Sequence, residues 1–386
     1  MIQKVLAHRA VLDTERVPLL EAHGRILGED IAADRDYPPF PRSARDGFAV
    51  RAADLPGALR IAGEVRAGER FAASVEPGTA VEIMTGAPVP DGADTVVMLE
   101  HAVVSDGVVT IERSAETGDN VSAQGSEGCA GEVLLRAGQR VDYAGIALMA
   151  TVGRGHVWVY RRLRVAIIAT GDEIVEIEAT PAAHQIRNSN SFSLAAQVAR
   201  AGATPVILPV ARDEISSTRA LIERGLKLDL LVLAGGVSAG KYDLVEKVLA
   251  EAGAEFYFDR VKIQPGQPLV FGSVRGKYFF GLPGNPGSTM VTFEVFARAA
   301  IELLSGKNEA NLPFTLSRLS KEFRQKTGLT RFLPALLSPD GSEIMPLLPW
   351  RGSGDVPSLV RANAFLVTEP DREEWAAGDF IRVMSK

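Results

Sequence analysis

The sequence predicts a multidomain protein of the α/β plus β class, with a central doubly wound α/β domain between β-rich regions. Strand-like and helix-like segments alternate strictly from about residue 163 to residue 306, which indicates a parallel sheet with helices on both faces. Residues 41–130 and the chain after Pro313 are instead rich in short apolar runs and turns, as in small β domains. The chain has 386 residues, which at about 150 residues per domain suggests two to four domains.

Composition excludes several classes of function. Hydrophobic residues make up 46% of the chain, enough for a buried core, and the formal net charge of −6 argues against a broad nucleic-acid surface. Cys129 is the only cysteine, which excludes an internal disulfide framework, a cysteine-rich zinc site and an iron–sulfur cluster. The N-terminus lacks an apolar signal core, and no apolar run reaches the roughly 18 residues that span a bilayer. We therefore expect a cytoplasmic protein with neither nucleic-acid nor membrane partners.

The first 163 residues contain short elements of both kinds. Residues 1–40 combine a short amphipathic helix with an extended stretch that breaks at Pro18 and at Pro38–Pro39. The segment HAVVSDGVVTIE (101–112) predicts two strands joined by a turn at Asp106–Gly107. YAGIALMATVG (143–153) then predicts a helix that ends in glycine, followed by the strand-like HVWVYRR.

The α/β region has the clearest periodicity. Its predicted strands are 163–170, 204–210 and 228–236, and its predicted helices are 191–202, 216–227 and 242–253. FDRVKI (258–263) and a hairpin over 268–282, turning at Arg275–Gly276, add strands before a long helix over 288–306. The chain that follows is β-rich, with a turn at 339–341 and a last strand near FIRVMSK.

Three glycine-containing loops follow strands of this region. They are Thr-Gly-Asp-Glu at 170–173, Gly-Gly-Val-Ser-Ala-Gly at 235–240, and Leu-Pro-Gly-Asn-Pro-Gly-Ser at 282–288. Glycines allow close backbone approach, and ligands of doubly wound sheets bind beyond the carboxyl ends of the strands. The loops predict a pocket for a phosphate or another oxyanion. One such loop alone occurs in any α/β domain, but the convergence of three favours binding.

Acidic residues gather at the same strand ends. Asp172, Glu173, Asp213 and Asp243 offer the carboxylate oxygens that Mg²⁺ prefers, often together with a substrate phosphate. Helix-capping acids are the alternative interpretation. Two segments of the β region, PFPRSARDGFAV and IMTGA, also have two possible interpretations. The acid of the first segment is either a turn residue or a functional group. The threonine of the second segment is either a cap or a functional group.

Six motifs in a fixed order resemble one family. The motifs are PFPRSARDGFAV, EIMTGAPVP, IIATGDEIVE, IRNSNS, LAGGVSAGKYD and GLPGNPGS. In this order they resemble the molybdopterin molybdenumtransferase family, which includes bacterial MoeA and the E domain of gephyrin. Each motif is moderately specific and the ordered set is highly specific. The resemblance covers the chain from about residue 17 to about residue 383.

The resemblance implies four domains in an elongated homodimer. The implied domains are a discontinuous N-terminal domain (1–40 and 131–163), an inserted β domain (41–130), a MogA-like molybdopterin-binding α/β domain (164–309) and a C-terminal β-barrel (310–386). The implied reaction joins molybdate to adenylated molybdopterin with Mg²⁺ and releases molybdenum cofactor and AMP. The implied cleft lies between the α/β domain of one subunit and the β domain of the other. A molybdopterin adenylyltransferase and molybdoenzyme-maturation proteins are the implied partners.

The resemblance also implies roles for individual residues. The catalytic candidates are Asp46, Thr85, Glu127 (where relatives usually have aspartate) and Glu173, and the metal or phosphate-side candidates are Asp213 and Asp243. Pro283 and Pro286 of the P-G-N-P motif and Ser358 of the last domain are implied substrate-binding residues. The other loop residues that we expect to bind substrate are Thr170, Gly171, Asp172, Gly235, Gly236, Ser238, Gly240, Gly284, Asn285 and Ser288.

One segment departs from the family pattern. Relatives usually read K-P-G-K-P where this chain has Gln264 and Gln267 in QPGQP, so two expected cations are missing. Arg260 and Lys262 lie close by in sequence; they either supply this charge or form a solvated strand edge. The departure keeps two alternatives open, a transferase for another oxyanion such as tungstate and a non-catalytic scaffold on the same fold.

Overall fold

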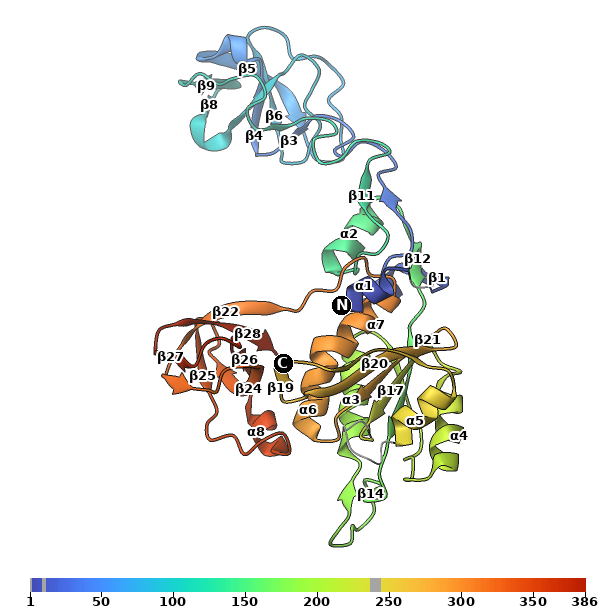
Figure 1. Ribbon diagram of the computed structural model, residues 1–386. Coiled ribbons are helices and arrows are strands. Elements are labelled where there is room, and N and C mark those ends of the chain that lie inside the picture. The colour runs from blue at the N-terminus through green and yellow to red at the C-terminus, as the bar shows by residue number, and fades with distance from the viewer. Residues whose placement is uncertain (1, 9–11, 237–243) are drawn as a thin grey trace.

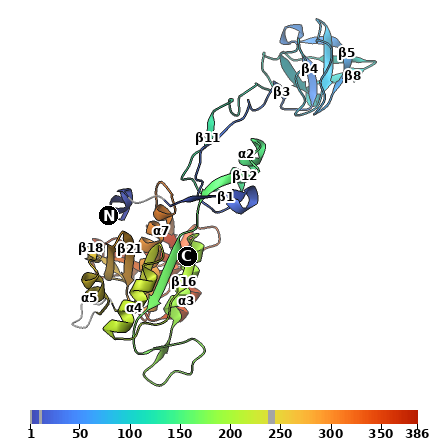
Figure 2. The same cartoon turned by 90° about the vertical axis from the view of Figure 1, so that its right-hand side faces the viewer.

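The computed structural model describes residues 2–8, 12–236 and 244–386. They form an elongated molecule in which a small β domain stands at one end of a narrow stem, and an α/β domain and a β-barrel lie together at the other end (Figure 1). The same separation holds in the view at right angles (Figure 2). The predicted class, multidomain α/β plus β with an inserted β domain and a C-terminal barrel, is confirmed.

The α/β domain is built on a six-stranded sheet in the order β16-β13-β17-β21-β20-β18. Its strands are β13 (Arg164–Ala169), β16 (Thr204–Ile207), β17 (Leu230–Ala234), β18 (Glu255–Arg260), β20 (Pro268–Val274) and β21 (Lys277–Leu282). Strands β16, β13, β17 and β21 are parallel, and β20 and β18 complete the sheet through antiparallel pairings. The first strand of the domain therefore lies inside the sheet, with its successors on either side.

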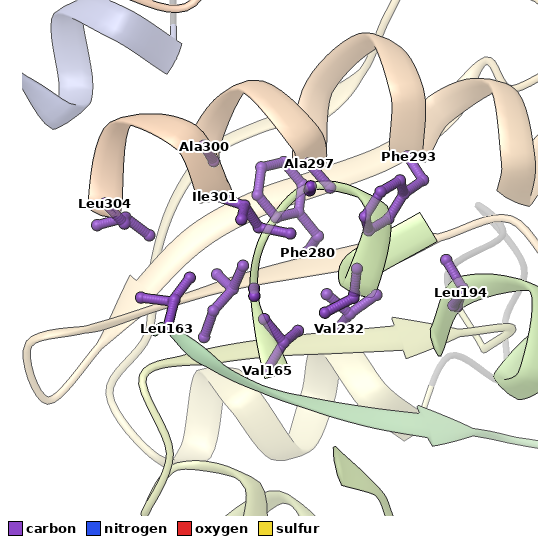
Figure 3. Packing of buried hydrophobic residues seen from close by; sticks show 14 of the residues in the cluster. Leu163, Val165, Leu194, Val232, Phe280, Phe293, Ala297, Ala300, Ile301 and Leu304 are labelled. Carbon is purple, nitrogen blue, oxygen red and sulfur yellow. The ribbon is translucent and has the colours of Figure 1, made fainter. Parts of the chain in front are cut away.

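Helices cover both faces of this sheet, as the alternation predicts. They are α3 (Ser189–Arg200), α4 (Ile215–Gly225), α5 (Leu244–Glu251), α6 (Pro286–Thr292) and α7 (Arg298–Leu304). Successive strand residues point to opposite faces, so Val165 and Ile167 pack under α3 and α7 while Ala166 and Ile168 pack against α4 and α5. Figure 3 shows the first of these cores, where the long helix lies across the strands.

Several boundaries in this domain differ from the prediction by a few residues, and two of these differences concern segments near the site. The last helix begins at Pro286, a residue suited to a first helical turn, and it passes through a π-helical turn, η5 (Phe293–Ala297), before ending at Leu304. The predicted strand over 258–263 is divided, because β18 ends at residue 260 and β19 (Ile263–Gln264) joins the barrel instead. The QPGQP segment thus starts in the contact between two domains.

The β domain contains a second six-stranded sheet. Its order is β7-β4-β6-β5-β9-β8, with β4 (Gly47–Val50), β5 (Gly57–Val65), β6 (Thr79–Ile83), β7 (Thr95–Met98), β8 (Val103–Ser105) and β9 (Val108–Ile111). Two-residue strands β3 (Arg42–Ser43) and β10 (Val121–Ser122) pair beside it. The predicted turn between β8 and β9 is present, with positive φ at Asp106 (52°) and Gly107 (76°).

The stem brings together two segments that are far apart in sequence. Strand β1 (Thr14–Pro18) pairs with β12 (His156–Tyr160), and β2 (Ile31–Ala32) pairs with β11 (Val133–Leu135). Helices α1 (Ile2–Val5) and α2 (Tyr143–Thr151) and the short 3-10 turns η1 (Leu6–His8) and η2 (Leu19–Ala22) complete this part. Two segments of the chain therefore connect the β domain to the stem, one entering the domain and one leaving it.

The C-terminal strands close into a barrel. The closed five are β22 (Phe314–Leu319), β24 (Thr330–Leu337), β25 (Glu343–Pro346), β26 (Ala364–Val367) and β28 (Phe380–Ser385). The pair β23 (Phe323–Arg324) with β27 (Glu374–Trp375) and the helix α8 (Val356–Arg361) lie outside this ring. Strand β19 adds to the barrel by pairing with β24, so that Gln264 lies opposite Arg331. Among helices of the described residues, none has both the length and the apolar character that crossing a bilayer needs.

Candidate functional site

A cavity of about 460 Å³ opens where the central strands of the α/β sheet end. Its wall includes residues from all three glycine-containing loops and from a fourth segment, 186–190, that leads into α3. The lining residues are Thr170, Glu173, Ile174, Ile186, Arg187, Asn188, Ser189, Asn190, Ala234, Gly235, Gly236, Pro268, Pro283, Gly284, Asn285, Pro286 and Ser288. We call this the strand-end cavity.

The cavity lies at the point where the strand order reverses. The chain moves from β13 to β16 on one side and then to β17 on the other, and the backbone N–H of Thr170 donates to the carbonyl of Ala234 across this point (3.1 Å). Strand ends diverge there because the connecting helices leave toward opposite faces of the sheet. The topology alone therefore opens a crevice between the loops after β13 and β17.

Glycines are required in the loop after β17. Gly235 and Gly236 have φ of 95° and 65°, in the left-handed region. A Cβ on Gly235 would lie 2.9 Å from the carbonyl oxygen of Thr170, and one on Gly236 would lie 2.8 Å from the hydroxyl of Thr170. The backbone of this loop consequently approaches the end of β13 more closely than any side chain would allow.

The P-G-N-P loop is fixed from within. The hydroxyl of Thr289 donates to the carbonyl oxygen of Pro283 (2.5 Å), and Pro286 occupies the first turn of α6, where a missing N–H is harmless. The Cα of Gly235 lies 3.6 Å from the position that a Cβ on Gly284 would take, so this loop and the loop after β17 are in close contact. The wall is rigid backbone here.

Two buried oxygens of the wall lack partners. Thr170 and Asn190 are 7% and 8% exposed, and the Thr170 hydroxyl and the Asn190 amide oxygen accept or donate no hydrogen bond among the described residues. The amide nitrogen of Asn190 donates to the carbonyl of Gly284 (2.7 Å). Buried polar atoms are normally satisfied, so these two indicate a polar guest in the cavity.

The positive charge at the cavity comes from a segment that our residue predictions missed. Arg187 is the one cation among the described residues of the wall, and Glu173 is the one carboxylate. The Nε of Arg187 donates to the carbonyl of Ala179 (3.1 Å), which fixes the side chain within its own loop. The sequence signal for this segment was the motif IRNSNS, a run of polar residues that leads into α3.

Arg260 and Lys262 do not line the strand-end cavity. Arg260 lies at the end of β18, the edge strand, and lines a separate apolar cavity with Phe258 and Phe296. Lys262 is exposed. β18 is three strands away from β17, about 14 Å at the usual spacing of about 4.8 Å between strands, which explains why nearness in sequence was misleading.

Of the other predicted loop residues, two acids lie beside the cavity wall. The backbone N–H of Asp213 donates to the carboxylate of Asp172 (3.1 Å), and both side chains are exposed. Gly171, also predicted, has a φ of 140°, and a Cβ there would lie 2.3 Å from a carboxylate oxygen of Glu173, so that side chain would have to move. Three predicted residues, Ser238, Gly240 and Asp243, lie outside the described residues. Within the described ranges, no three His, Cys, Asp or Glu side chains are grouped as a metal site.

A second cavity, of about 430 Å³, adjoins the first through Pro268 and Ser288. We call it the barrel-side cavity, because β24 and the chain that precedes α8 form its outer wall. Its lining residues are Gln264, Pro265, Gly266, Gln267, Pro268, Ser288, Gln325, Leu329, Arg331, Leu333, Leu348, Trp350, Gly352 and Ser353. Both glutamines of QPGQP therefore line this cavity. Arg331 is the one cation among the described residues that line it.

Ser358 does not reach either cavity. It is 2% exposed, and its hydroxyl donates to the carboxylate of Asp355, the N-cap residue of α8 (2.6 Å). Asp355 also caps the helix by accepting from the backbone N–H of Ser358 (3.1 Å), and the two bonds keep Ser358 inside its own helix turn. Ser353, five residues earlier, is the serine that lines the barrel-side cavity.

The remaining predicted acids, Asp46 and Glu127, lie on the β domain, each bonded to a neighbouring side chain. The carboxylate of Asp46 accepts hydrogen bonds from the backbone N–H (2.6 Å) and the hydroxyl (2.8 Å) of Thr85. These bonds, the backbone bond first, hold the pKa of Asp46 below its usual value. Glu127 pairs with Arg42 (2.6 Å). All four side chains are partly or fully exposed, and the stem separates the β domain from the α/β domain of the same chain (Figures 1 and 2).

Comparison with known proteins identifies the family. The chain matches the MoeA N-terminal region (domain I and II) over residues 1–153, a probable molybdopterin binding domain over 166–303 and the MoeA C-terminal region (domain IV) over 317–385. The molybdopterin molybdenumtransferase of Bacillus subtilis is 35% identical over 385 residues, covering 96% of this chain and 90% of that protein. The chain belongs to the molybdopterin molybdenumtransferase family. It is thus an enzyme of the transferase class.

Other relatives agree with this family. The molybdopterin molybdenumtransferase of Staphylococcus epidermidis is 31% identical over 393 residues, covering 99% of this chain and 94% of that protein. A MoeA molybdopterin biosynthesis protein from Pyrococcus horikoshii has the same architecture, with a TM-score of 0.81 at 28% identity, covering 100% of this chain and 98% of that one. The resemblance carried by the six ordered motifs is confirmed.

Proposed function

We propose that this member of the molybdopterin molybdenumtransferase family inserts molybdenum into adenylated molybdopterin, releasing molybdenum cofactor and AMP with the help of Mg²⁺. The observation that carries the proposal is the strand-end cavity, whose wall combines left-handed glycines, a fixed P-G-N-P loop and unpartnered buried oxygens. Such a wall suits a ligand that has both a phosphate and a polar ring system.

Arg187 is our candidate for holding the phosphate in the strand-end cavity. It replaces Arg260 and Lys262 in this role, because it lines the cavity and they do not. A guanidinium matches tetrahedral oxyanions through several N–H donors at once. The backbone bond to Ala179 leaves the outer nitrogens available, since no carboxylate among the described residues pairs with Arg187.

The donor set beside this cavity suits Mg²⁺. Asp172, Asp213 and Glu173 offer only oxygen ligands, and Mg²⁺ commonly takes one or two carboxylates together with waters and substrate phosphate. Asp172 and Asp213 would hold the ion together with the predicted ligand Asp243. When bound, the ion neutralises phosphate charge during hydrolysis of the adenylate. The protein's part is to hold the phosphate and its ligands in place.

The barrel-side cavity is our candidate for the oxyanion substrate. It adjoins the strand-end cavity through Ser288. Gln264 and Gln267 give it neutral N–H donors in place of two cations. Arg331 supplies positive charge from the barrel strand opposite Gln264. Because this cavity has less positive charge than two lysines would provide, we expect weaker binding of the oxyanion. A comparison of molybdate with tungstate determines which metal is preferred.

The β-domain acids act from a second copy of the chain in this proposal. The β domain, which carries Asp46 and Thr85, lies at the far end of the stem from the α/β domain of the same chain (Figure 1), so one chain cannot bring these residues to the strand-end cavity without a large rearrangement. A two-fold dimer would place the β domain of one subunit over the cavity of the other. Asp46, Glu127 and Glu173 would then manage protons around the exchange of oxygen for sulfur on the metal.

A direct assay tests the proposal. Purified protein is incubated with adenylated molybdopterin, Mg²⁺ and either molybdate or tungstate, and AMP release is measured, with EDTA and oxyanion-free controls. We expect AMP with molybdate. AMP release with tungstate alone would assign the other oxyanion, and no release with either would favour a scaffold role on the same fold.

A further inference from the structure

Asn190 is a cavity residue whose side chain the protein uses only in part. It is the second residue of α3, and its amide nitrogen donates to the carbonyl oxygen of Gly284 (2.7 Å). Because a carbonyl oxygen only accepts, this bond fixes which way the amide points. The amide oxygen is then left buried in the cavity wall, with no donor among the described residues.

The chemistry of that oxygen restricts what can sit against it. An amide oxygen only accepts hydrogen bonds, so it repels phosphate and molybdate oxygens, which at neutral pH present lone pairs. A fused nitrogen heterocycle with an exocyclic amine presents N–H groups instead. Both the pterin and the adenine of the proposed substrate have such an amine. The oxygen of Asn190 therefore suits the ring end of the ligand.

We propose that Asn190 is a recognition residue that accepts a hydrogen bond from the exocyclic amine of the bound heterocycle while its nitrogen holds the Gly284 loop. The proposal rests on the function proposed above and adds a direction to it. The amine end of the ligand lies against Asn190, and Arg187 of the same wall remains the candidate for its phosphate end.

Thr170 does not carry the same information. Its hydroxyl is also buried without a partner among the described residues, but a hydroxyl rotates to donate or accept and so suits either end of a ligand. Asn190 is the more decisive of the two because its bond to Gly284 leaves it one role. Its amide nitrogen also bonds to Gly284, in a loop that forms part of the same cavity wall.

Matched ligands separate recognition from loop positioning. Dissociation constants are measured by calorimetry for AMP against purine riboside 5′-monophosphate, which lacks the amine, and for 6-hydroxymethylpterin phosphate against its 2-desamino analogue. A neutral hydrogen bond to a buried acceptor predicts that the wild type prefers one amine-bearing ligand by about fivefold to tenfold. The pair that shows the preference tells whether adenine or pterin is the group that Asn190 contacts.

Three variants then test the residue. Asn190→Ala should bring the preference close to 1, whereas Asn190→Asp keeps an acceptor and should retain the preference at a lower overall affinity. Asn188→Ala is the control: its side chain caps α3 by accepting from the N–H of Ser191 (3.2 Å), so it should weaken both members of a pair equally. Melting temperatures verify that each variant is folded.

The outcomes separate the two proposals. If the wild type shows no preference in either pair, or if Asn190→Ala lowers both affinities and leaves the preference unchanged, Asn190 only positions the loop and the inference is wrong. In that case the proposed function still stands, because the ligands bind. If no pterin or nucleotide probe binds the wild type, the proposed function and this inference are both overturned.

Discussion

The strand-end cavity and the acid cluster of the β domain are built in different ways. The cavity is made from backbone: left-handed glycines at 235 and 236, a fixed P-G-N-P loop and buried amide groups. The β-domain cluster is made from exposed side chains, Asp46 with Thr85 and Arg42 with Glu127. The first should therefore be sensitive to added carbon atoms, and the second to the loss of a functional group without loss of stability.

Removing the charge of Asp46 should have the largest effect. Asp46→Asn retains the size of the side chain, so we expect AMP release to fall about 100-fold or more, typical for loss of a proton-transferring group, with the melting temperature unchanged. Asp106→Asn is the matched control, an exposed acid on the same domain at a positive φ that asparagine tolerates. Equal activity in both variants would remove Asp46 from the reaction.

Mixing variants tests whether the two regions act across subunits. Asp46→Asn and Gly235→Ala damage different regions, so if each site is shared between two subunits as proposed, one of the two sites of a mixed dimer is intact. We expect a mixture of the two to regain up to about a quarter of wild-type AMP release after subunit exchange, as a symmetric dimer requires. A mixture as inactive as its components, with exchange verified by a tag, would place both regions in one chain.

Adding one carbon to the cavity should reduce binding about tenfold or more. Gly235→Ala places a Cβ 2.9 Å from the backbone oxygen of Thr170, so the loop must move. Gly253→Ala is the control in the same domain, with φ of 85° and nothing within 4 Å, so it has only the penalty of about 1–2 kcal/mol for a left-handed residue. AMP calorimetry and urea unfolding of both variants separate the clash from the backbone strain.

Arg187 and Arg260 should differ by a smaller factor. Arg187→Gln removes the cation of the cavity wall and should weaken AMP binding about fivefold to tenfold, with a reduced dependence on salt. Arg260→Gln changes an arginine of the separate apolar cavity and should leave AMP affinity within about twofold. The reverse ranking would restore Arg260 to the site.

The smallest effect concerns the pKa of Asp46. Thr85→Val removes the hydroxyl bond but retains the backbone N–H bond, which is the larger cause of the lowered pKa. The pKa of Asp46 should therefore rise part of the way to its ordinary value. Because the ionised form then persists over a narrower range, the acid limb of the activity profile should move to higher pH. Carbon-13 NMR of the carboxyl group gives the pKa directly.

Local patterns were sufficient for much of the fold and for three walls of the cavity. Strict alternation over 163–306 required parallel strands, and parallel strands must end on one edge of the sheet. The loops at 170–173, 235–236 and 283–288 therefore had to meet. Patterns were also sufficient for the two hairpin turns. Asp106–Gly107 and Arg275–Gly276 each lie between two strand-like segments, and these residues adopt positive φ.

Other parts of the site depend on contacts that no local pattern contains. Arg187 and Asn190 enter the cavity because the excursion from β14 (Ile174–Val175) to β15 (Ile186–Arg187) folds back beside the strand ends. Ser353 rather than Ser358 faces the barrel-side cavity because Asp355 caps α8 and retains Ser358. The cavity that a side chain of a loop or a barrel reaches depends on residues that are distant from it in sequence.

By itself, the sequence determined the class of fold, the family and the edge of the sheet where the strand-end cavity opens, since periodicity and glycine placement act over a few residues. Only the tertiary structure decided which cation lines the cavity and which predicted residues lie elsewhere. Arg260 is close to Gln264 in the chain, yet it ends an edge strand and faces another cavity. Side chains respond to electrostatic fields and hydrogen bonds in space, and folding alone determines which strand ends are neighbours.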